Sequence, residues 1–217
     1  LASDVSADSV TIRSDGDIEI HNRIEALNGG VTLDSGSALQ LSGQVDTTAM
    51  PVGGTIKLSG SAVQLSHEEL LTSGSLLQVS GPVTVDGNVL FDTGDRQASM
   101  TGGDVRFLNV IAGTDGVGDT LRIDARSAGI GGSVALQAAV GSTSSQPLLS
   151  DLNGLRIDAQ EIELNSVSVT SGDVLLIADE IRLMVGEVRT SIAGDIVFDG
   201  ELLLPSGDTS VTSAGRV

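Results

Sequence analysis

The chain has 217 residues, with 29 Asp and Glu against 11 Lys and Arg, which gives a net charge of −18. This charge repels phosphate backbones and anionic lipid headgroups, so we expect no nucleic-acid partner and no binding to anionic membrane surfaces. No apolar run approaches the length of a membrane span, so we expect no membrane insertion by this segment. There are 28 Gly, three Phe and no Trp, Tyr or Cys. The core must therefore be almost wholly aliphatic, and disulfides and thiolate metal sites are excluded.

Apolar residues recur in pairs, separated by one residue, from the beginning of the chain. Period-two alternation over so few residues predicts short β-strands with one buried face. In the first half the pairs are Val10 and Ile12, Ile18 and Ile20, Val31 and Leu33, Leu39 and Leu41, Ile56 and Leu58, Val63 and Leu65, Val83 and Val85, and Val105 and Phe107. In the second half they begin at Leu155, Ile162, Val167, Val174, Ile181, Ile196 and Leu202.

One segment, residues 66–74, reads as helical. Ser66 and Glu69 have the spacing of a capping box, and Gly74 stands where a helix would stop. We expect a short helical excursion here or no helix at all.

Glycines placed just ahead of strands set a slower period. They are Gly30, Gly54, Gly81, Gly103, Gly132, Gly154, Gly172 and Gly194. Their spacing averages about 23 residues, close to the length of about 22 residues of one three-strand coil of a solenoid. The sequence therefore predicts an all-β fold, a right-handed parallel β-helix or three-faced β-solenoid of about ten coils. Residues 1–217 would form a single segment, which we expect to belong to a longer precursor.

The sequence Leu-Arg-Ile-Asp-Ala occurs twice, at 121–125 and 155–159. Alternation places its Leu and Ile inward and its Arg and Asp outward. A solenoid can reuse any short pattern that stacks well, so the repeat is interpreted as structural. The offset of the two copies differs from one 22-residue coil, so they need not be direct neighbours.

Residues 102–142, followed by SGDVLLIADEIRL and AGDIVFDGELLLPSG, resemble the β-strand repeats of large bacterial surface proteins. These are the filamentous-haemagglutinin-like and autotransporter-like adhesins. The resemblance implies a right-handed parallel β-helix, export to the surface of a bacterium, and a role as a stalk, filament or adhesin. It implies no catalytic residue set.

Two pairs of acids are the candidates for a metal site. Asp15 and Asp17 lie in SDGDIE, which is similar to the opening of a calcium loop, and Asp115 and Asp119 lie in the Gly-rich stretch GTDGVGDT. A solvated strand edge is the favoured interpretation of the first pair, and a plain turn that of the second. No cofactor is expected, and calcium is the one metal considered.

We therefore expect a structural or adhesive segment of an extracellular bacterial protein, without catalytic activity. Its expected partners are further coils along the solenoid axis, from the same precursor or from another copy, and a ligand on a host or neighbouring cell. Two alternatives remain, a carbohydrate-active β-helix enzyme and a cytoplasmic, polymer-forming β-helix of the bactofilin kind. The enzyme is disfavoured because Trp and Tyr are absent and Lys57 is the single lysine.

Overall fold

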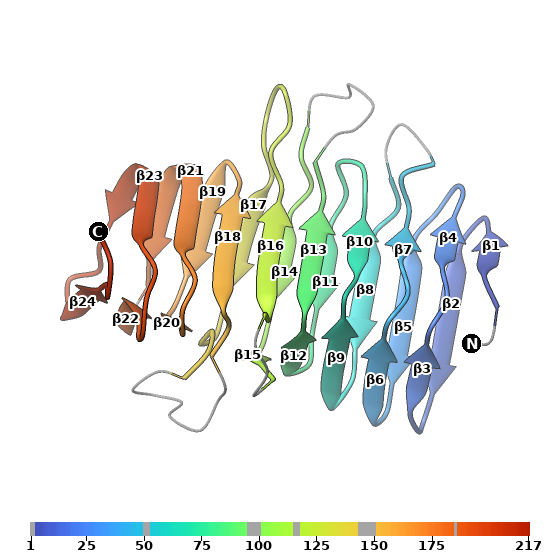
Figure 1. Cartoon of the computed structure of the whole chain (residues 1–217). Coiled ribbons are helices and arrows are strands. Elements are labelled where there is room, and N and C mark those ends of the chain that lie inside the picture. Colours follow the sequence, from blue (N-terminus) through green and yellow to red (C-terminus); the bar gives the residue numbers. More distant parts are fainter. Residues whose placement is uncertain (1–2, 50–52, 95–100, 115–117, 143–150, 185) are drawn as a thin grey trace.

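The computed structural model describes residues 3–49, 53–94, 101–114, 118–142, 151–184 and 186–217. The regular elements of these residues are 24 β-strands, β1 to β24, which wind into a parallel β-solenoid (Figure 1). The expected fold class is thus confirmed. Within the described ranges, no helix is long and apolar enough to cross a membrane.

Three strand faces surround the core. Face 1 contains β1 (Val5–Ala7), β4 (Ile24–Ala26), β7 (Val45–Asp46), β10 (Glu69–Leu71), β13 (Asn88–Asp92), β16 (Thr120–Asp124) and β18 (Gly154–Asp158). Face 2 contains β2 (Val10–Ser14), β5 (Val31–Ser35), β8 (Ile56–Ser59), β11 (Leu77–Val79), β14 (Val105–Phe107), β17 (Ser133–Leu136) and β19 (Glu161–Leu164). Face 3 contains β3 (Ile18–Ile20), β6 (Ala38–Leu41), β9 (Ala62–Ser66), β12 (Val83–Asp86), β15 (Ile111–Gly113), β20 (Val167–Val169), β22 (Gly186–Thr190) and β24 (Thr209–Thr212).

Two long strands join faces 1 and 2. The first part of β21 (Val174–Leu183) pairs with β18, and its second part pairs with β19. The next strand, β23 (Ile196–Leu203), follows β21 through the same corner with a register shift after Ile177. Because these strands run through the corner, faces 1 and 2 form one 16-stranded sheet. On face 3, Val140 links the two shorter sheets by bridging Ile111 and Val167.

The stack has about eight turns, fewer than the ten expected. Coil lengths vary, because Val31 pairs with Val10 after 21 residues whereas Ile157 pairs with Ile123 after 34. The glycines ahead of strands also do not lie at the same corner of every coil, because Gly30 precedes a strand of face 2 and Gly81 a strand of face 3. At about 4.8 Å per turn the stack is roughly 40 Å long, shorter than ten coils would give.

The two Leu-Arg-Ile-Asp-Ala copies lie on direct neighbours, β16 and β18. Leu121 pairs with Leu155, and Ile123 with Ile157, in register. The 34-residue offset is therefore a single long coil. Part of that coil, residues 143–150, lies outside the described residues.

A single aliphatic core runs through all coils. Most of the expected apolar pairs are buried, with Val31, Leu33, Leu39 and Ile56 at 0% exposure, while Ile12 in β2 is only partly buried. Each such side chain contributes about 1.5–3 kcal/mol by its removal from water. In the middle of the stack two rings meet edge to face, with the centroids of Phe91 and Phe107 5.0 Å apart.

Of the two possibilities at residues 66–74, a short helical excursion or no helix, the structure has the second. Ser66 ends β9, and β10 begins at Glu69. Pairing with β7 and β13 satisfies the backbone of β10, which a local helix would have to satisfy within itself. The tertiary pairing of the coil thus outweighs the local capping pattern.

In three successive coils, a buried threonine lies at the corner where the chain leaves face 1. Thr47, Thr72 and Thr93 are at most 1% exposed, and each hydroxyl donates a hydrogen bond to a main-chain carbonyl. The Thr72 hydroxyl, for example, lies 2.8 Å from the carbonyl oxygen of Ser75. These bonds fix the point at which the chain leaves face 1.

Candidate functional site

Face 1 carries charged side chains in two rows that run along the stack. Because its strands pair in parallel register, outward residues of successive coils stand beside one another, about 4.8 Å apart. The acidic row begins after Ser6 and consists of Glu25, Asp46, Asp92, Asp124, Asp158 and Asp199, interrupted by Leu71 and Ile177. The mixed row, two residues earlier on each strand, consists of Glu69, Leu90, Arg122, Arg156, Leu175 and Val197.

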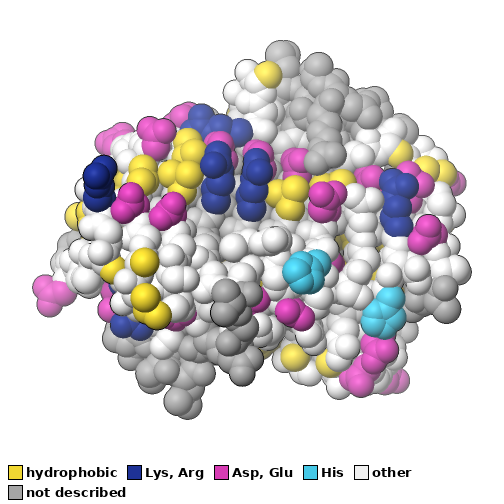
Figure 2. Space-filling view, in the orientation of Figure 1, with side chains coloured by type: hydrophobic (Ala, Val, Ile, Leu, Met, Phe, Trp, Pro, Cys, Tyr) yellow, Lys and Arg dark blue, Asp and Glu magenta, His cyan; other side chains and the backbone are white. Residues whose placement is uncertain are grey.

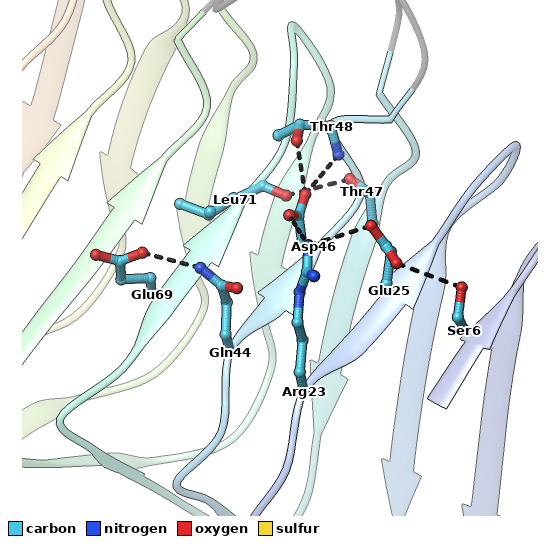
Figure 3. Close-up of polar contacts among 9 residues, drawn as sticks. All are labelled: Ser6, Arg23, Glu25, Gln44, Asp46, Thr47, Thr48, Glu69 and Leu71. Atoms are coloured by element: carbon cyan, nitrogen blue, oxygen red, sulfur yellow. Dashed lines mark hydrogen bonds and ion pairs between the residues drawn. The ribbon is translucent and has the colours of Figure 1, made fainter. Parts of the chain in front are cut away.

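At the N-terminal end of the acidic row, Arg23 neutralises two carboxylates from different coils (Figure 3). Its Nη2 atom lies 3.1 Å from Oε1 of Glu25 and 2.7 Å from Oδ2 of Asp46. Burial opposes ionisation of Asp46, but hydrogen bonds from Thr48 and Arg23 outweigh it and lower the pKa of Asp46. This network crosslinks neighbouring coils.

Three acids of the row follow one another without interruption in the middle of the stack. They are Asp92, Asp124 and Asp158, on β13, β16 and β18. Partial burial, together with the charges of its two neighbours, raises the pKa of Asp124. Arg126 compensates part of this charge, with Nε 2.6 Å from Oδ1 of Asp158.

A groove of about 460 Å³ lies beside the mixed row, over β10, β13 and β16. We call it the His67 groove. Its polar lining includes His67, Glu69, Asn88, Thr120 and Arg122. The Thr120 hydroxyl donates to the side-chain oxygen of Asn88, which leaves the Asn88 amide nitrogen to serve as a donor.

Among the described residues other than glycine, only His67 has a left-handed backbone conformation, with φ of 53°. Its ring lies against Gly87, where an added Cβ would stand 2.1 Å from Cε1 of the ring. Gly87 itself has φ of 81°. Such a conformation costs about 1–3 kcal/mol and is maintained by its surroundings, so the coil holds the His67 ring at one side of the groove.

Glu68, the next residue, points inward and was not singled out by the sequence. It is 3% exposed, its Oε1 accepts a hydrogen bond from the Ser66 amide at 3.0 Å, and its Oε2 has no partner. Burial raises the pKa of Glu68 to about 9, so the carboxyl is neutral at neutral pH. The alternation of inward and outward residues could have identified it, because Glu68 lies two residues before the buried Leu70 and therefore faces the same side of the strand.

The first predicted calcium pair lies at the junction of β2 and β3. Asp15 borders a shallow exposed depression with Arg13 and Asp34. Asp17 Oδ1 accepts a hydrogen bond from the Ala38 amide at 3.0 Å, and this bond lowers the pKa of Asp17. The structure thus gives Asp17 a role in joining two coils.

In the second pair, Asp115 lies outside the described residues and Asp119 is buried at 2% exposure. Asp119 Oδ1 accepts from the Gly87 amide at 2.8 Å, and Oδ2 accepts from the amide and hydroxyl of Thr114 at 2.6 and 2.7 Å. The Asp119 side chain therefore connects its own loop to the preceding coil by hydrogen bonds. A calcium site formed with Asp115 stays a prediction.

No group of three or more His, Cys, Asp or Glu side chains in the described ranges is arranged to hold a metal ion. Comparisons of the chain with protein-family models, with curated proteins and with solved structures found no match.

Proposed function

We propose that the chain is a structural and adhesive segment of an extracellular bacterial surface protein or filament. The observation that carries this proposal is the continuity of the stack. One aliphatic core extends through all coils, from Ile18 near one end to Ile196 near the other. Such a solenoid is a stiff spacer, because bending it would require neighbouring coils to separate.

Cross-coil polar contacts strengthen the same architecture. Arg23 binds carboxylates of two coils, and Asp104 Oδ1 accepts hydrogen bonds from the amide and hydroxyl of Ser133, 29 residues later. These contacts resist sliding of one coil over the next. The resemblance of residues 102–142 to adhesin repeats supports the same role.

The open strand edges support axial contacts. Among the described strands, β1, β2 and β3 pair on one side only at one end of the stack, as β23 and β24 do at the other. All three faces are present at both ends, although β23 covers faces 1 and 2 as one strand, and apolar side chains are partly buried at both ends, such as Ile12 and Phe198. A further coil, from the same precursor or another copy, would complete their hydrogen bonding.

Location tests the proposal. Antibodies raised against the purified chain are applied to intact and to permeabilised cells of the bacterium that encodes it, with a cytoplasmic protein as the control antigen. We expect labelling of intact cells, and loss of this labelling after external protease treatment. Labelling confined to permeabilised cells would contradict the proposal and favour a cytoplasmic polymer.

A further inference from the structure

We propose that the His67 groove and the adjoining pair Arg122 and Arg156 bind a sugar-sized ligand that carries a carboxylate. This inference rests on the adhesive role proposed above and names the chemistry of the ligand. Figure 2 shows two basic side chains side by side over β16 and β18, between hydrophobic side chains of the same face.

The two arginines are register partners on adjacent strands, and both are exposed. Arg122 Nη2 lies 3.4 Å from Asp124 Oδ2, so the Asp124 carboxylate compensates part of the Arg122 charge. The Arg156 side chain forms no ion pair or hydrogen bond with any described residue, whereas its main chain belongs to the ladders with β16 and β21. Two guanidinium groups on neighbouring strands, whose backbones are about 4.8 Å apart, repel each other, and a carboxylate between them would remove that repulsion and accept paired hydrogen bonds.

The groove supplies contacts for the rest of such a ligand. The side-chain amide of Asn88 offers donors, and the Glu69 carboxylate offers acceptors to hydroxyl groups. Leu90, between Glu69 and Arg122 in the mixed row, presents an apolar surface to the carbon face of a ring. A volume of about 460 Å³ lies within the usual range of small-ligand sites.

The acids around the groove do not exclude an anion. Glu68 is buried and neutral at neutral pH. Glu69 Oε2 accepts a hydrogen bond from the Gln44 amide at 2.9 Å, on the side away from the arginines. Asp124 and Asp158 lie two residues further along their strands and bind Arg122 and Arg126. Arg156 is therefore the residue to which we assign the carboxylate.

The test is a nuclear magnetic resonance titration of the full chain with three probes at low salt. Glucuronate has both the ring and the carboxylate, glucose has the ring alone, and acetate has the carboxylate alone. We expect glucuronate to bind with a Kd on the order of 1 mM and to shift the Arg122, Arg156 and Asn88 side-chain signals. Glucose and acetate should bind at least about tenfold more weakly, since each lacks half of the contacts.

Arg156→Gln should weaken glucuronate binding by about tenfold or more, because it removes one charge-assisted pair. The matched control is Arg106→Gln, which removes an exposed arginine on face 2 that is paired with Asp104. Backbone spectra of both variants establish that the fold is intact.

Three results would overturn the inference: no shift at the arginines, equal affinity for acetate and glucuronate, or undiminished binding by Arg156→Gln. Failure here is separable from failure of the proposed function. If the chain is found on the cell surface but does not bind glucuronate, this site alone is refuted. If the chain is cytoplasmic and binds glucuronate, the surface role alone is refuted.

Discussion

Arg23 and Asp46 form an ion pair between successive coils, with Nη2 and Oδ2 2.7 Å apart. The Asp46 side chain is only 12% exposed, so it depends on this partner more than a surface carboxylate would. Pairs of this kind join coils whose strands have just two or three residues on face 1.

Arg23→Ala should therefore lower the free energy of unfolding by about 1–3 kcal/mol, measured by urea denaturation at neutral pH. The matched control is Arg13→Ala. Arg13 Nε lies 3.8 Å from Asp34 Oδ2, with side-chain exposures of 73% and 51%, so its loss should cost at most about 0.5 kcal/mol. Equal losses for the two variants would contradict this account of the row.

Glu68 should make the stability depend on pH. Its pKa is about 9 in the folded chain and near 4.5 when it is solvated, so between these values the folded state binds more protons than the unfolded state. Stability is therefore greatest below the lower value and falls as pH rises towards 9, by up to about 1.4 kcal/mol per pH unit.

Glu68→Gln should abolish this decline and be more stable than the unmodified chain at pH 8 or above. The matched control, Glu69→Gln, changes the charge of an exposed neighbour and should keep the decline. Unfolding curves across this pH range decide the question. If Glu68→Gln kept the same slope as the unmodified chain, the carboxyl would not be buried and protonated.

Asp119 should stabilise its loop without calcium. Asp119→Ala leaves the amides of Gly87 and Thr114 without their acceptor, which should cost about 2–4 kcal/mol. Thermal unfolding with and without millimolar calcium should show the same loss in both conditions. A saturable increase in Tm on adding calcium, abolished in the variant, would instead establish the site predicted with Asp115.

The open edges should allow association along the axis. Sedimentation of the purified chain should show larger species as concentration rises, in the form of open stacks. Val197→Lys places a charge on the edge strand β23, at a residue that is 43% exposed, and should shift the equilibrium towards the monomer. The control is Thr84→Lys on β12, an inner strand that pairs on both sides, and it should leave the equilibrium unchanged. A chain that stays monomeric at all concentrations would contradict axial association between copies.

The strands could be predicted because alternation is a local signal. Val83 and Val85 are buried while Thr84 between them is not, as the pattern indicates. The number of coils could not be predicted, since it depends on loop lengths. Val5 meets Ile24 after 19 residues, whereas Leu121 meets Leu155 after 34, so a single average period miscounts the turns.

The candidate site lay beyond sequence reasoning for the same reason. Arg122 and Arg156 become neighbours only when the register is known, and the acidic row is assembled from strands far apart in sequence. The burial of Glu68 could not be predicted for a different reason, because two sequence patterns disagree at this position. Its parity with Leu70 indicated an inward side chain, but the capping pattern of Ser66 and Glu69 pointed to a helix.

The register of β16 and β18 is the claim on which the rows, the groove and the arginine pair all depend. Since the chain has no Cys, Arg122→Cys combined with Arg156→Cys introduces the only two thiols. Register partners about 4.8 Å apart fall within the Cα distances of disulfides, whereas Arg122→Cys with Leu175→Cys spans two strand spacings and does not. Mild oxidation followed by thiol counting and peptide mass analysis should show an intramolecular disulfide in the first variant alone. If the first pair stays reduced, or if both pairs crosslink equally, the two Leu-Arg-Ile-Asp-Ala copies are not register partners.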